Sequence, residues 1–563
     1  MSQLPKTDVV IIGLGAAGGI ASYVLTQAGL NVVGIEAGPY RSAAYNYDHQ
    51  LDEIGGESYR NQMGEPKVNH EVPTWRPNAK APVQPPPVPP LLMMNGVGGT
   101  SVHYTTQSWR FRRDDFKIRT ETIAKYGEKA LPAGTAIVDW PVTYDELEPY
   151  YDKVEYLIGV SGQGGSNPFE SPRKRGYPLP PLREMGFRTL ADQGMKQLGY
   201  HPFPQPSAII SQDYDGRPAC TYCGFCSGYG CWNNAKSSTL VSAIPKAVAT
   251  GKLDIRPNSR VMQILTDNGG NASGVKYLDD SGQPQIQPAA VVILSGYVYP
   301  NNRLLLLSKS AKFPNGLANN HGQVGKYYLS HSYVGVNGLF SGKRLNIFNG
   351  AGGQNAVMDD LNGDNFDHKG LGFIRGATIQ AGNGTLPIAS SSSIPPNVPG
   401  WGSAYKRWLH ENAQSVGSVL AQQETLPYET NYIDLDPTKK DPLGVPVVRL
   451  TYDFGVNEKR AGAYMANKMT EILKAMGAVQ TWPSFPPIPI PINTHAYGGT
   501  RMGDDPSMSV VNKYSLAHEV PNLAILGGST FCSTTGYNPT ETIEALAWYA
   551  ADNIAQNFNK IAV

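Results

Sequence analysis

The fold is decided by residues 9–36, which read VVIIGLGAAGGIASYVLTQAGLNVVGIE. The apolar run Val9–Ile12 predicts a buried strand, and the run from Ile20 to Ala28 predicts a helix. Glycines fill the turn between them, where they permit a tight bend and let a pyrophosphate approach the helix N-terminus. These glycines are Gly13, Gly15 and Gly18. A second apolar run ends in Glu36, which is placed to bond a ribose hydroxyl, so the segment predicts a dinucleotide site.

Two other interpretations of this segment stay open from the sequence alone. The glycines could form a turn in an unrelated α/β unit, and residues 9–30 could be taken for a membrane span. Five glycines within that span, and the polar residues that flank it, favour a buried β–α unit over a transmembrane helix.

Length and charge give broad limits on the function. A chain of 563 residues predicts two or more domains. The counts of Lys+Arg (47) and Asp+Glu (46) are nearly equal, so we expect neither a nucleic-acid footprint nor a polybasic membrane patch. Residues 1–8 contain no long apolar run, so we expect no secretory signal peptide before the first strand.

Further elements are predicted from apolar periodicity. Buried strands are expected at residues 289–294 and 523–526, and helices at 145–159, 302–308, 457–476 and 540–557. The region 340–490 is rich in Gly, Ser, Asn and Pro with short alternating runs, which predicts an antiparallel sheet with long loops. Residues 82–90 predict an extended, polyproline-like surface crossing.

Four of the five cysteines lie close together, with the spacing C-x2-C-x2-C-x4-C. They are Cys220, Cys223, Cys226 and Cys231. The C-x2-C-x2-C core is typical of iron–sulfur ligation and predicts a metal site here. A four-cysteine zinc site is one alternative, although its cysteines usually come as two separated pairs. Two disulfides are another alternative, although neighbours this close form strained bridges.

Several motifs occur in one order along the chain. The first glycine turn is followed by a second glycine loop, Asn95–Tyr104, and by a strand–helix element, Val291–Ser308. The segments Ile525–Ser529 and Asn538–Ile543 come later. With these motifs the chain resembles a glucose–methanol–choline (GMC) oxidoreductase over nearly its whole length. The cysteine stretch is absent from ordinary oxidases of that family, and it makes the chain most similar to the large flavoprotein subunits of gluconate 2-dehydrogenase and related sugar dehydrogenase complexes.

The resemblance implies an α/β fold, α+β overall. It implies a three-layer ββα Rossmann-like domain that binds FAD and a substrate domain with an antiparallel sheet. We expect the FAD-binding domain from residues 1–115, 235–335 and 490–563. We expect the substrate domain from residues 116–234, which include the cysteine stretch, and from residues 336–489.

The resemblance also implies which residues bind FAD. They are Gly13, Gly15, Gly18, Glu36, Gly98, Gly99, Thr100, Ser101, His103, Val261, Gly528, Ser529, Pro539 and Thr540. His103 resembles a position from which some sugar-oxidising relatives link a histidine covalently to the flavin. A histidine packed against the flavin without a bond is the alternative.

Oxidation of a secondary alcohol needs a base for the hydroxyl proton and an acceptor for the hydride, which FAD supplies. His495 matches the family's catalytic histidine, and an imidazole is a suitable base near neutral pH. Asn538 matches the partner that bonds the same substrate hydroxyl. Many family members carry a second histidine there, and the asparagine occurs in sugar-oxidising branches, so the resemblance favours a carbohydrate substrate.

Three classes of function are compatible with these features. The first is a sugar or sugar-acid dehydrogenase that passes electrons from FAD through an iron–sulfur cluster to a cytochrome or quinone. It could be of the gluconate 2-dehydrogenase kind, or it could act on a glucoside at C3 or on another hexose. The cluster is expected to be [3Fe-4S], with [4Fe-4S] as the alternative. The second is an oxygen-using sugar oxidase, and the third is a non-catalytic electron-transfer subunit. The cysteines argue against the second class, and His495 with Asn538 argues against the third.

The resemblance also implies partners and a location. Relatives of this kind leave the cytoplasm folded, bound to a small subunit that bears a twin-arginine signal, and dock on a multihaem cytochrome c subunit. We therefore expect the periplasmic face of the inner membrane, with membrane association only through a partner. A soluble cytoplasmic dehydrogenase is the alternative.

Four residues near these motifs are expected to have other roles. Cys532 is predicted to be a buried, unreactive thiol. The cluster of Arg110, Arg112 and Arg113 is expected at the surface or between domains.

Overall fold

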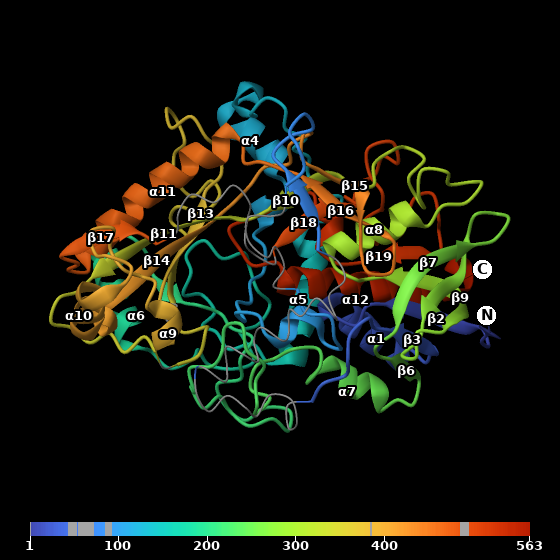
Figure 1. Cartoon of the computed structure of the whole chain (residues 1–563), viewed down its shortest axis with the longest axis horizontal. Helices are drawn as coiled ribbons and strands as arrows, with labels where there is room; N and C mark the ends of the chain where they lie inside the picture. The colour runs from blue at the N-terminus through green and yellow to red at the C-terminus, as the bar shows by residue number, and fades with distance from the viewer. Residues whose placement is uncertain are drawn as a thin grey trace.

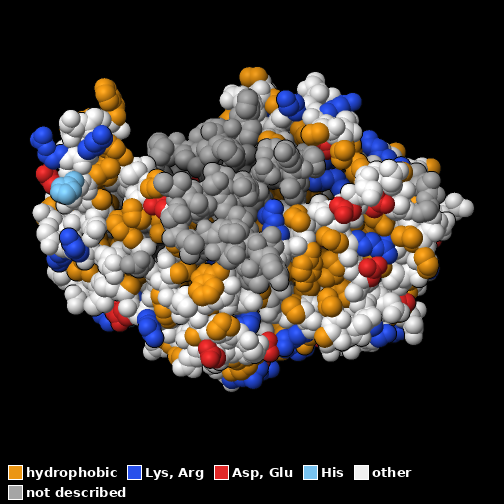
Figure 2. Space-filling model, turned by 60° about the horizontal axis from the view of Figure 1, so that its bottom comes forward, with side chains coloured by type: hydrophobic (Ala, Val, Ile, Leu, Met, Phe, Trp, Pro, Cys, Tyr) orange, Lys and Arg blue, Asp and Glu red, His pale blue; other side chains and the backbone are white. Residues whose placement is uncertain are grey.

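The computed structural model describes residues 2–42, 53, 72–84, 93–348, 350–382, 386–484 and 495–562. Residues 85–90 of the predicted polyproline-like crossing lie outside the described residues. Figure 1 shows an elongated molecule, with the N-terminal strands and both labelled chain ends at the right and a second sheet at the left. On the face shown in Figure 2, basic and acidic side chains are interspersed over the described surface, as the balanced charge predicts.

The largest sheet has eight strands, with the main order β6-β3-β2-β9-β8-β7 and with β1 and β19 also paired to β9. Its strands are β1 (Ser2–Gln3), β2 (Thr7–Ile12), β3 (Val32–Ile35), β6 (Leu253–Arg256), β7 (Arg260–Thr266), β8 (Ala272–Leu278), β9 (Pro284–Leu294) and β19 (Leu523–Ile525). The first half of β9 pairs antiparallel with β8, and its second half pairs parallel with β2 and β19. One long strand therefore joins an antiparallel ribbon to a parallel sheet.

Alternate residues of β2 face two different cores, as the period of a strand requires. Val9 and Ile11 pack in a core with residues of α1 (Ala16–Gln27), α7 (Ala243–Val248) and α12 (Thr540–Gln556). Val10 and Ile12 pack in a second core with residues of β7, β8 and α8 (Val298–Leu307). Helices thus cover one face of the parallel sheet and the ribbon covers the other, which gives the predicted three layers.

Two further sheets form the rest of the framework. A five-stranded sheet has the order β18-β10-β15-β16-β4 and a six-stranded sheet has the order β17-β11-β14-β13-β12-β5. The first comprises β4 (Thr74–Arg76), β10 (Lys326–Ser330), β15 (Tyr432–Lys440), β16 (Pro446–Thr451) and β18 (Ala496–Gly499). The second comprises β5 (Phe203–Pro204), β11 (Ser332–Leu339), β12 (Ala356–Met358), β13 (Ala377–Ala381), β14 (Val416–Gln423) and β17 (Gln480–Pro483).

The six-stranded sheet is antiparallel throughout, which confirms the sheet predicted for this region. Residues of α6 (Gly186–Gln197) and α11 (Val456–Ala475) share a core with its strands. Strand β10 ends at Ser330 and β11 begins at Ser332, so His331 alone separates two strands of different sheets. This junction positions the site described below.

The described part of the chain has further helices, of which α5 (Tyr144–Ile158) packs against α12 and contributes residues to the second core. These further helices are α4 (Ile118–Tyr126), α5, α9 (Pro387–Ser390), α10 (Gly402–Asn412) and α13 (Phe558–Ile561), with single 3-10 turns that include η1 (Gly99–Val102) and η5 (Gly528–Thr530). The predicted helices at 145–159, 457–476 and 540–557 correspond to α5, α11 and α12 and are confirmed. The domain boundaries stay a prediction. No helix in the described ranges combines the length and the apolar character that a bilayer crossing needs.

Candidate active site

The first glycine turn accepts only glycine at two of its positions. Gly13 has a φ of +89°, and a Cβ added to Gly18 would lie 2.0 Å from the Gly13 carbonyl oxygen. Helix α1 begins at Ala16, directly after Gly15. A Cβ on Gly15 would meet only Gly99 Cα, at 3.8 Å, among the described residues. The space at the helix N-terminus is therefore open, which fits the pyrophosphate of a dinucleotide.

The second glycine loop lies against the first. The Gly98 N–H donates to the Leu14 carbonyl at 2.8 Å. A Cβ on Gly99 would lie 2.8 Å from Gly15 Cα, so the two loops touch through their glycines. Thr100 and Ser101 follow in η1, where the Ser101 hydroxyl donates to the Gly98 carbonyl at 2.6 Å.

Glu36 stands at the end of β3 beside both loops. Its Oε2 accepts the Leu14 N–H at 2.9 Å and its Oε1 accepts the Gly38 N–H at 3.0 Å. Burial raises the pKa of this carboxyl, and these backbone donors act in the opposite direction. A carboxylate oxygen can accept a second bond, so a ribose hydroxyl is compatible with these contacts. Val261 lies in β7, two residues after Ser259. The Ser259 N–H donates to the Glu36 carbonyl at 2.8 Å, so the start of β7 lies next to Glu36.

The remaining predicted FAD residues lie in η5 and at the N-terminus of α12. Gly528 and Ser529 lie in η5, where Ser529 Oγ accepts a bond from Asn301 Nδ2 at 3.0 Å. Pro539 precedes α12, and Thr540 is its first residue. The partial positive charge of this helix end favours a negatively charged group nearby.

His495 and Asn538 come together as predicted. Asn538 Nδ2 donates to His495 Nε2 at 3.1 Å. Burial lowers the pKa of His495 to about 3, so its imidazole is neutral and able to accept a proton at pH 7. Asn538 Oδ1 is buried and has no hydrogen-bond partner among the described residues. A substrate hydroxyl would satisfy this acceptor.

Three further side chains that no sequence motif indicates belong to this cluster: His331, Tyr333 and Tyr497. Nδ1 of His495 lies 2.8 Å from His331 Nδ1 and 2.9 Å from Tyr333 Oη. His331 Nε2 lies 2.7 Å from the carbonyl of Thr535 and 3.2 Å from Tyr497 Oη. The only signal for His331 in the sequence is its place between two strand-forming runs, which does not reveal its partner.

His103 is buried at the end of η1, directly after the residues of the second glycine loop that are predicted to bind FAD. Its carbonyl accepts the Gly228 N–H at 2.8 Å, which joins this segment to the cysteine stretch. The computed structural model carries no ligand, and the covalent link to a flavin stays a prediction.

Comparison with known proteins identifies the family. Residues 139–332 and 427–547 match two parts of the family described as GMC oxidoreductase. Over 99% of this chain and 95% of the relative, the sequence is 33% identical to the gluconate 2-dehydrogenase flavoprotein of Pantoea cypripedii. The chain belongs to the GMC oxidoreductase family.

Other relatives of this GMC oxidoreductase have related descriptions. The large subunit of fructose dehydrogenase from Gluconobacter japonicus is 28% identical, over 99% of both chains. The 2-methyl-1,2-propanediol dehydrogenase of Mycolicibacterium austroafricanum is 31% identical, over 99% of this chain and 96% of its own. The crystal structure of pyridoxine 4-oxidase from Mesorbium loti has a TM-score of 0.63 at 16% identity, covering 98% of this chain and 99% of its own, and it supports the fold alone. Family membership implies an FAD cofactor, and the two glycine loops fit it.

The cysteine stretch of this GMC oxidoreductase is less well organised than its spacing predicts. All five cysteines lie in the described residues, and none forms a disulfide. In the described part of the chain, no group of three or more His, Cys, Asp or Glu side chains is arranged to hold a metal ion. Burial raises the pKa of Cys220 to about 12, and it also raises that of Cys223. The structure therefore does not confirm the predicted metal site, because neutral thiols in this arrangement do not form a ligand set.

A buried lysine anchors the same stretch. Lys236 is 3% exposed, and its ammonium donates to the carbonyls of Tyr104 at 3.1 Å, Tyr229 at 2.8 Å and Cys226. These bonds fix the cysteine stretch against the segment that contains His103. The cysteine stretch of this GMC oxidoreductase thus adjoins residues predicted to bind FAD, although the two segments lie far apart in sequence.

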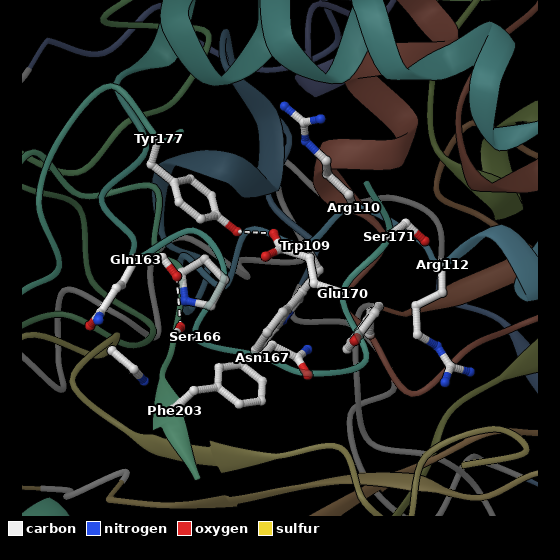
Figure 3. A pocket seen from close by; sticks show the side chains of 13 residues that line it. Trp109, Arg110, Arg112, Gln163, Ser166, Asn167, Glu170, Ser171, Tyr177 and Phe203 are labelled. Atoms are coloured by element: carbon white, nitrogen blue, oxygen red, sulfur yellow. Dashed lines mark hydrogen bonds between the residues drawn. The ribbon is translucent and has the colours of Figure 1, made fainter. Parts of the chain in front are cut away.

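A small pocket lies beside Tyr537, the residue before Asn538 (Figure 3). Side chains from residues 109–112, 163–177 and 203–206 line it together with Tyr537. Trp109 stacks on Tyr537 with ring centroids 4.8 Å apart, and the Tyr537 hydroxyl donates to Asp359 Oδ2 at 2.5 Å. The cavity measures about 20 Å³, room for about one water molecule and too little for a sugar ring. These contacts therefore brace the residue before Asn538 and do not form the substrate site.

Arg110 and Arg112, expected at the surface or between domains, are buried, which excludes a surface position and leaves a position between domains as a prediction. Arg110 donates to Glu155 with two bonds of 2.8 Å and to Glu148 at 3.1 Å, and Arg112 donates to Asp115 at 3.0 Å. Arg113 is exposed, as predicted. Cys532 is 1% exposed, with its thiol bonded to the Met502 carbonyl, which agrees with its predicted structural role.

Proposed function

We propose that this GMC oxidoreductase oxidises a secondary alcohol of a sugar or sugar acid to a ketone, with gluconate at C2 as the first candidate. The observation that carries the proposal is the pairing of a neutral, buried His495 with an Asn538 whose Oδ1 lacks a partner among the described residues. His495 Nε2 can accept the proton of the reacting hydroxyl, and Asn538 Oδ1 can accept a hydrogen bond from a neighbouring hydroxyl of the same substrate. FAD, when bound, accepts the hydride from the carbinol carbon.

The relatives support a carbohydrate substrate. The names of two of them specify gluconate and fructose, and the chain aligns with both over nearly its full length. A glucoside 3-dehydrogenase or another hexose dehydrogenase is the second candidate. An oxygen-using sugar oxidase is the third, and relatives described as oxidases, such as the paromamine 6′-oxidase of Streptomyces fradiae, support it.

A substrate panel tests the proposal. Gluconate, glucose, fructose and a methyl glucoside are added anaerobically to the purified flavoprotein, and bleaching of the flavin absorbance is followed. We expect gluconate to bleach it and 2-deoxygluconate, which lacks the reacting hydroxyl, to leave it unchanged. Bleaching by a hexose alone, with a product oxidised at another carbon, would select the second candidate. Stoichiometric peroxide on re-aeration would select the oxidase.

We also propose that the cysteine stretch holds an iron–sulfur cluster, [3Fe-4S] or [4Fe-4S], and that electrons leave towards a cytochrome or quinone. The C-x2-C-x2-C spacing and the contact between Gly228 and His103 support this, whereas the unligated arrangement of the thiols does not. Iron and acid-labile sulfide assays on protein purified without oxygen decide it, and zinc without sulfide would favour the alternative.

The covalent link to FAD is proposed on the place of His103 beside the second glycine loop. Protein precipitated with acid should stay yellow and should yield a flavin-bearing peptide that contains His103. Complete release of flavin into the supernatant would contradict the link and leave the proposed activity intact.

The partners and the location are proposed together. One relative is described as a large subunit, which supports a complex. We propose a small twin-arginine subunit, a multihaem cytochrome c subunit and a position on the periplasmic face of the inner membrane. Expression of the chain alone and with its neighbouring genes, followed by cell fractionation, tests this. Activity that stays in the cytoplasm with every partner present would favour the alternative location.

A further inference from the structure

A single buried histidine connects the base to the backbone. His331 is 0% exposed and lies between β10 and β11, opposite His495, which precedes β18. The register pairs Ser330 with Ala496, and the His331 N–H donates to the His495 carbonyl at 3.4 Å. Both imidazoles are therefore held by the ends of paired strands rather than by a long loop.

The contacts of the His331 ring determine where its proton is. Its Nε2 lies 2.7 Å from the Thr535 carbonyl, which can only accept a hydrogen bond, so Nε2 carries the hydrogen. Burial holds the pKa of His331 well below its usual value, so the ring is neutral and its Nδ1 presents a lone pair. The hydrogen of His331 is thus fixed by the main chain.

The same reasoning then applies to His495. Its Nδ1 lies 2.8 Å from His331 Nδ1, a distance at which two lone pairs would repel, so His495 Nδ1 carries the hydrogen. The second neighbour of this nitrogen is Tyr333 Oη at 2.9 Å. The Tyr333 hydroxyl donates onward to Gln422 Oε1 at 3.1 Å, which leaves its oxygen as an acceptor. Both neighbours therefore favour a hydrogen on Nδ1 of His495.

We propose that His331 is a positioning residue that fixes the tautomer of His495 with its lone pair on Nε2, beside Asn538. The inference rests on the proposed function and adds to it the residue that prepares the base. In the reaction, the substrate O–H bond breaks and the proton joins His495 Nε2. FAD, when bound, would accept the carbinol hydride with its electron pair, and the substrate would become the ketone. The His495 cation keeps its Nδ1–H bonded to His331, where the bond is strengthened by the charge.

A spectroscopic measurement tests the tautomer without any turnover. The oxidised, flavin-bound enzyme is prepared with ¹⁵N-histidine, and the ring signals are assigned by their loss in His495→Ala and His331→Phe. We expect His495 to carry its hydrogen on Nδ1 and His331 on Nε2. A His495 hydrogen on Nε2 in the unaltered enzyme would overturn the proposal.

Kinetic variants give the second readout. The change His331→Phe keeps the ring volume and removes both nitrogens, and we expect flavin reduction to slow by about 10- to 100-fold, the effect of losing one charge-assisted bond. His331→Gln offers a donor and an acceptor and should recover part of the rate. Tyr452→Phe is the matched control, because it removes a bond of 3.2 Å to the Ser330 carbonyl without touching either imidazole, and its rate should stay within about twofold of the parent.

The outcomes separate this proposal from the proposed function. If the His331→Phe variant retains its flavin and substrate reduces that flavin at the parent rate, the positioning role is wrong. If His331→Phe does not fold, the ring signals of the unaltered enzyme and the rate of His331→Gln still decide. If no sugar or sugar acid bleaches the flavin, the proposed substrate class is wrong. The tautomer measurement needs no substrate, so it still tests whether His331 fixes the hydrogen of His495.

Discussion

The cluster of His495, Asn538, His331, Tyr333 and Tyr497, here called the catalytic cluster, and the cysteine stretch both contain several titratable side chains. They differ in how strongly hydrogen bonds within the protein fix their reactive atoms. In the catalytic cluster, the ring nitrogens of His331 and His495 have polar contacts of 2.7–3.1 Å without any ligand. In the cysteine stretch, the thiols make weaker sulfur bonds, such as Cys220 Sγ with the Tyr222 N–H at 3.4 Å and Cys231 Sγ with Asn233 Oδ1 at 3.0 Å.

The difference shows that one physical effect can have opposite consequences for reactivity. Burial keeps His495 neutral, and the neutral imidazole is the form that accepts a proton. Burial also keeps Cys220 and Cys223 neutral, and the neutral thiol is the form that does not bind metals. The base of the catalytic cluster is therefore in its reactive protonation state at pH 7, whereas the cysteines must lose their protons to bind a cation.

Removing the base should have the largest effect on the prepared cluster. We expect His495→Ala to slow flavin reduction by about 10²–10⁴-fold, the usual contribution of a general base. The flavin should remain bound, because the contacts of His495 with Asn538, His331 and Tyr333 involve neither glycine loop. Stopped-flow reduction with saturating substrate measures the rate. An unchanged rate would show that another residue takes the proton.

Removing a cysteine should change the iron content of the protein without changing the rate of flavin reduction. We expect Cys223→Ser to lower iron content by about 10-fold or more, since even the loss of a hydrogen-bond partner of a metal ligand costs about 10–100-fold in affinity. Reduction of the flavin by substrate should stay unchanged, because the two groups are separate. Cys532→Ser is the control, since this thiol is buried elsewhere and bonds to the Met502 carbonyl. Equal iron in the parent, Cys223→Ser and Cys532→Ser would place the iron outside the stretch.

The pH dependence should reveal the low pKa of the base. Because burial lowers the pKa of His495 to about 3, the rate of flavin reduction should vary by less than about twofold between pH 5.5 and 8. The same shift lowers the free energy of unfolding as the pH drops from about 6.5 towards 3, because in this range His495 is protonated in the unfolded chain and neutral in the folded protein. A rate that halves near pH 6.5 would contradict the buried, neutral base.

The smallest effect is expected at the anchor of the cysteine stretch. Lys236→Met should lower the free energy of unfolding by about 1–3 kcal/mol, because it leaves buried carbonyls without their donor. Lys246→Met is the matched control, since the side chain of this lysine is 38% exposed and pairs with the partly exposed Asp215, so its loss should cost less than about 1 kcal/mol. Denaturant unfolding measures both. Equal stability of the two variants would mean that water replaces the ammonium.

The glycine turn and the long helices could be predicted from sequence because their determinants are local. Gly13 and Gly18 are required by a bend within a few residues, and α5, α11 and α12 follow their own apolar periodicity. The pair of His495 and Asn538 could be predicted only through the family resemblance, because nothing in either segment alone shows that they meet.

The parts that could not be predicted depend on contacts between distant segments. His331 and His495 meet because β10 pairs with β18, and the intervening chain gives no signal of that register. Arg110 is buried because Glu148 and Glu155 of α5 neutralise it, which a cluster of basic residues does not reveal. The cysteine spacing predicts a ligand set, but spacing does not determine how the backbone turns between the thiols or whether they are charged.

Strand β9 also has a consequence for synthesis on the ribosome. Its parallel neighbour β19 is reached only after a long stretch of chain, and Asn522 next to β19 bonds the Ala290 carbonyl of β9 across 232 residues. Contacts of such separation form slowly, because a large loop must close first. Until residues 523–525 emerge, one edge of β9 stays open to pairing with other chains, so a nascent chain that pauses before this point is a natural client for a chaperone.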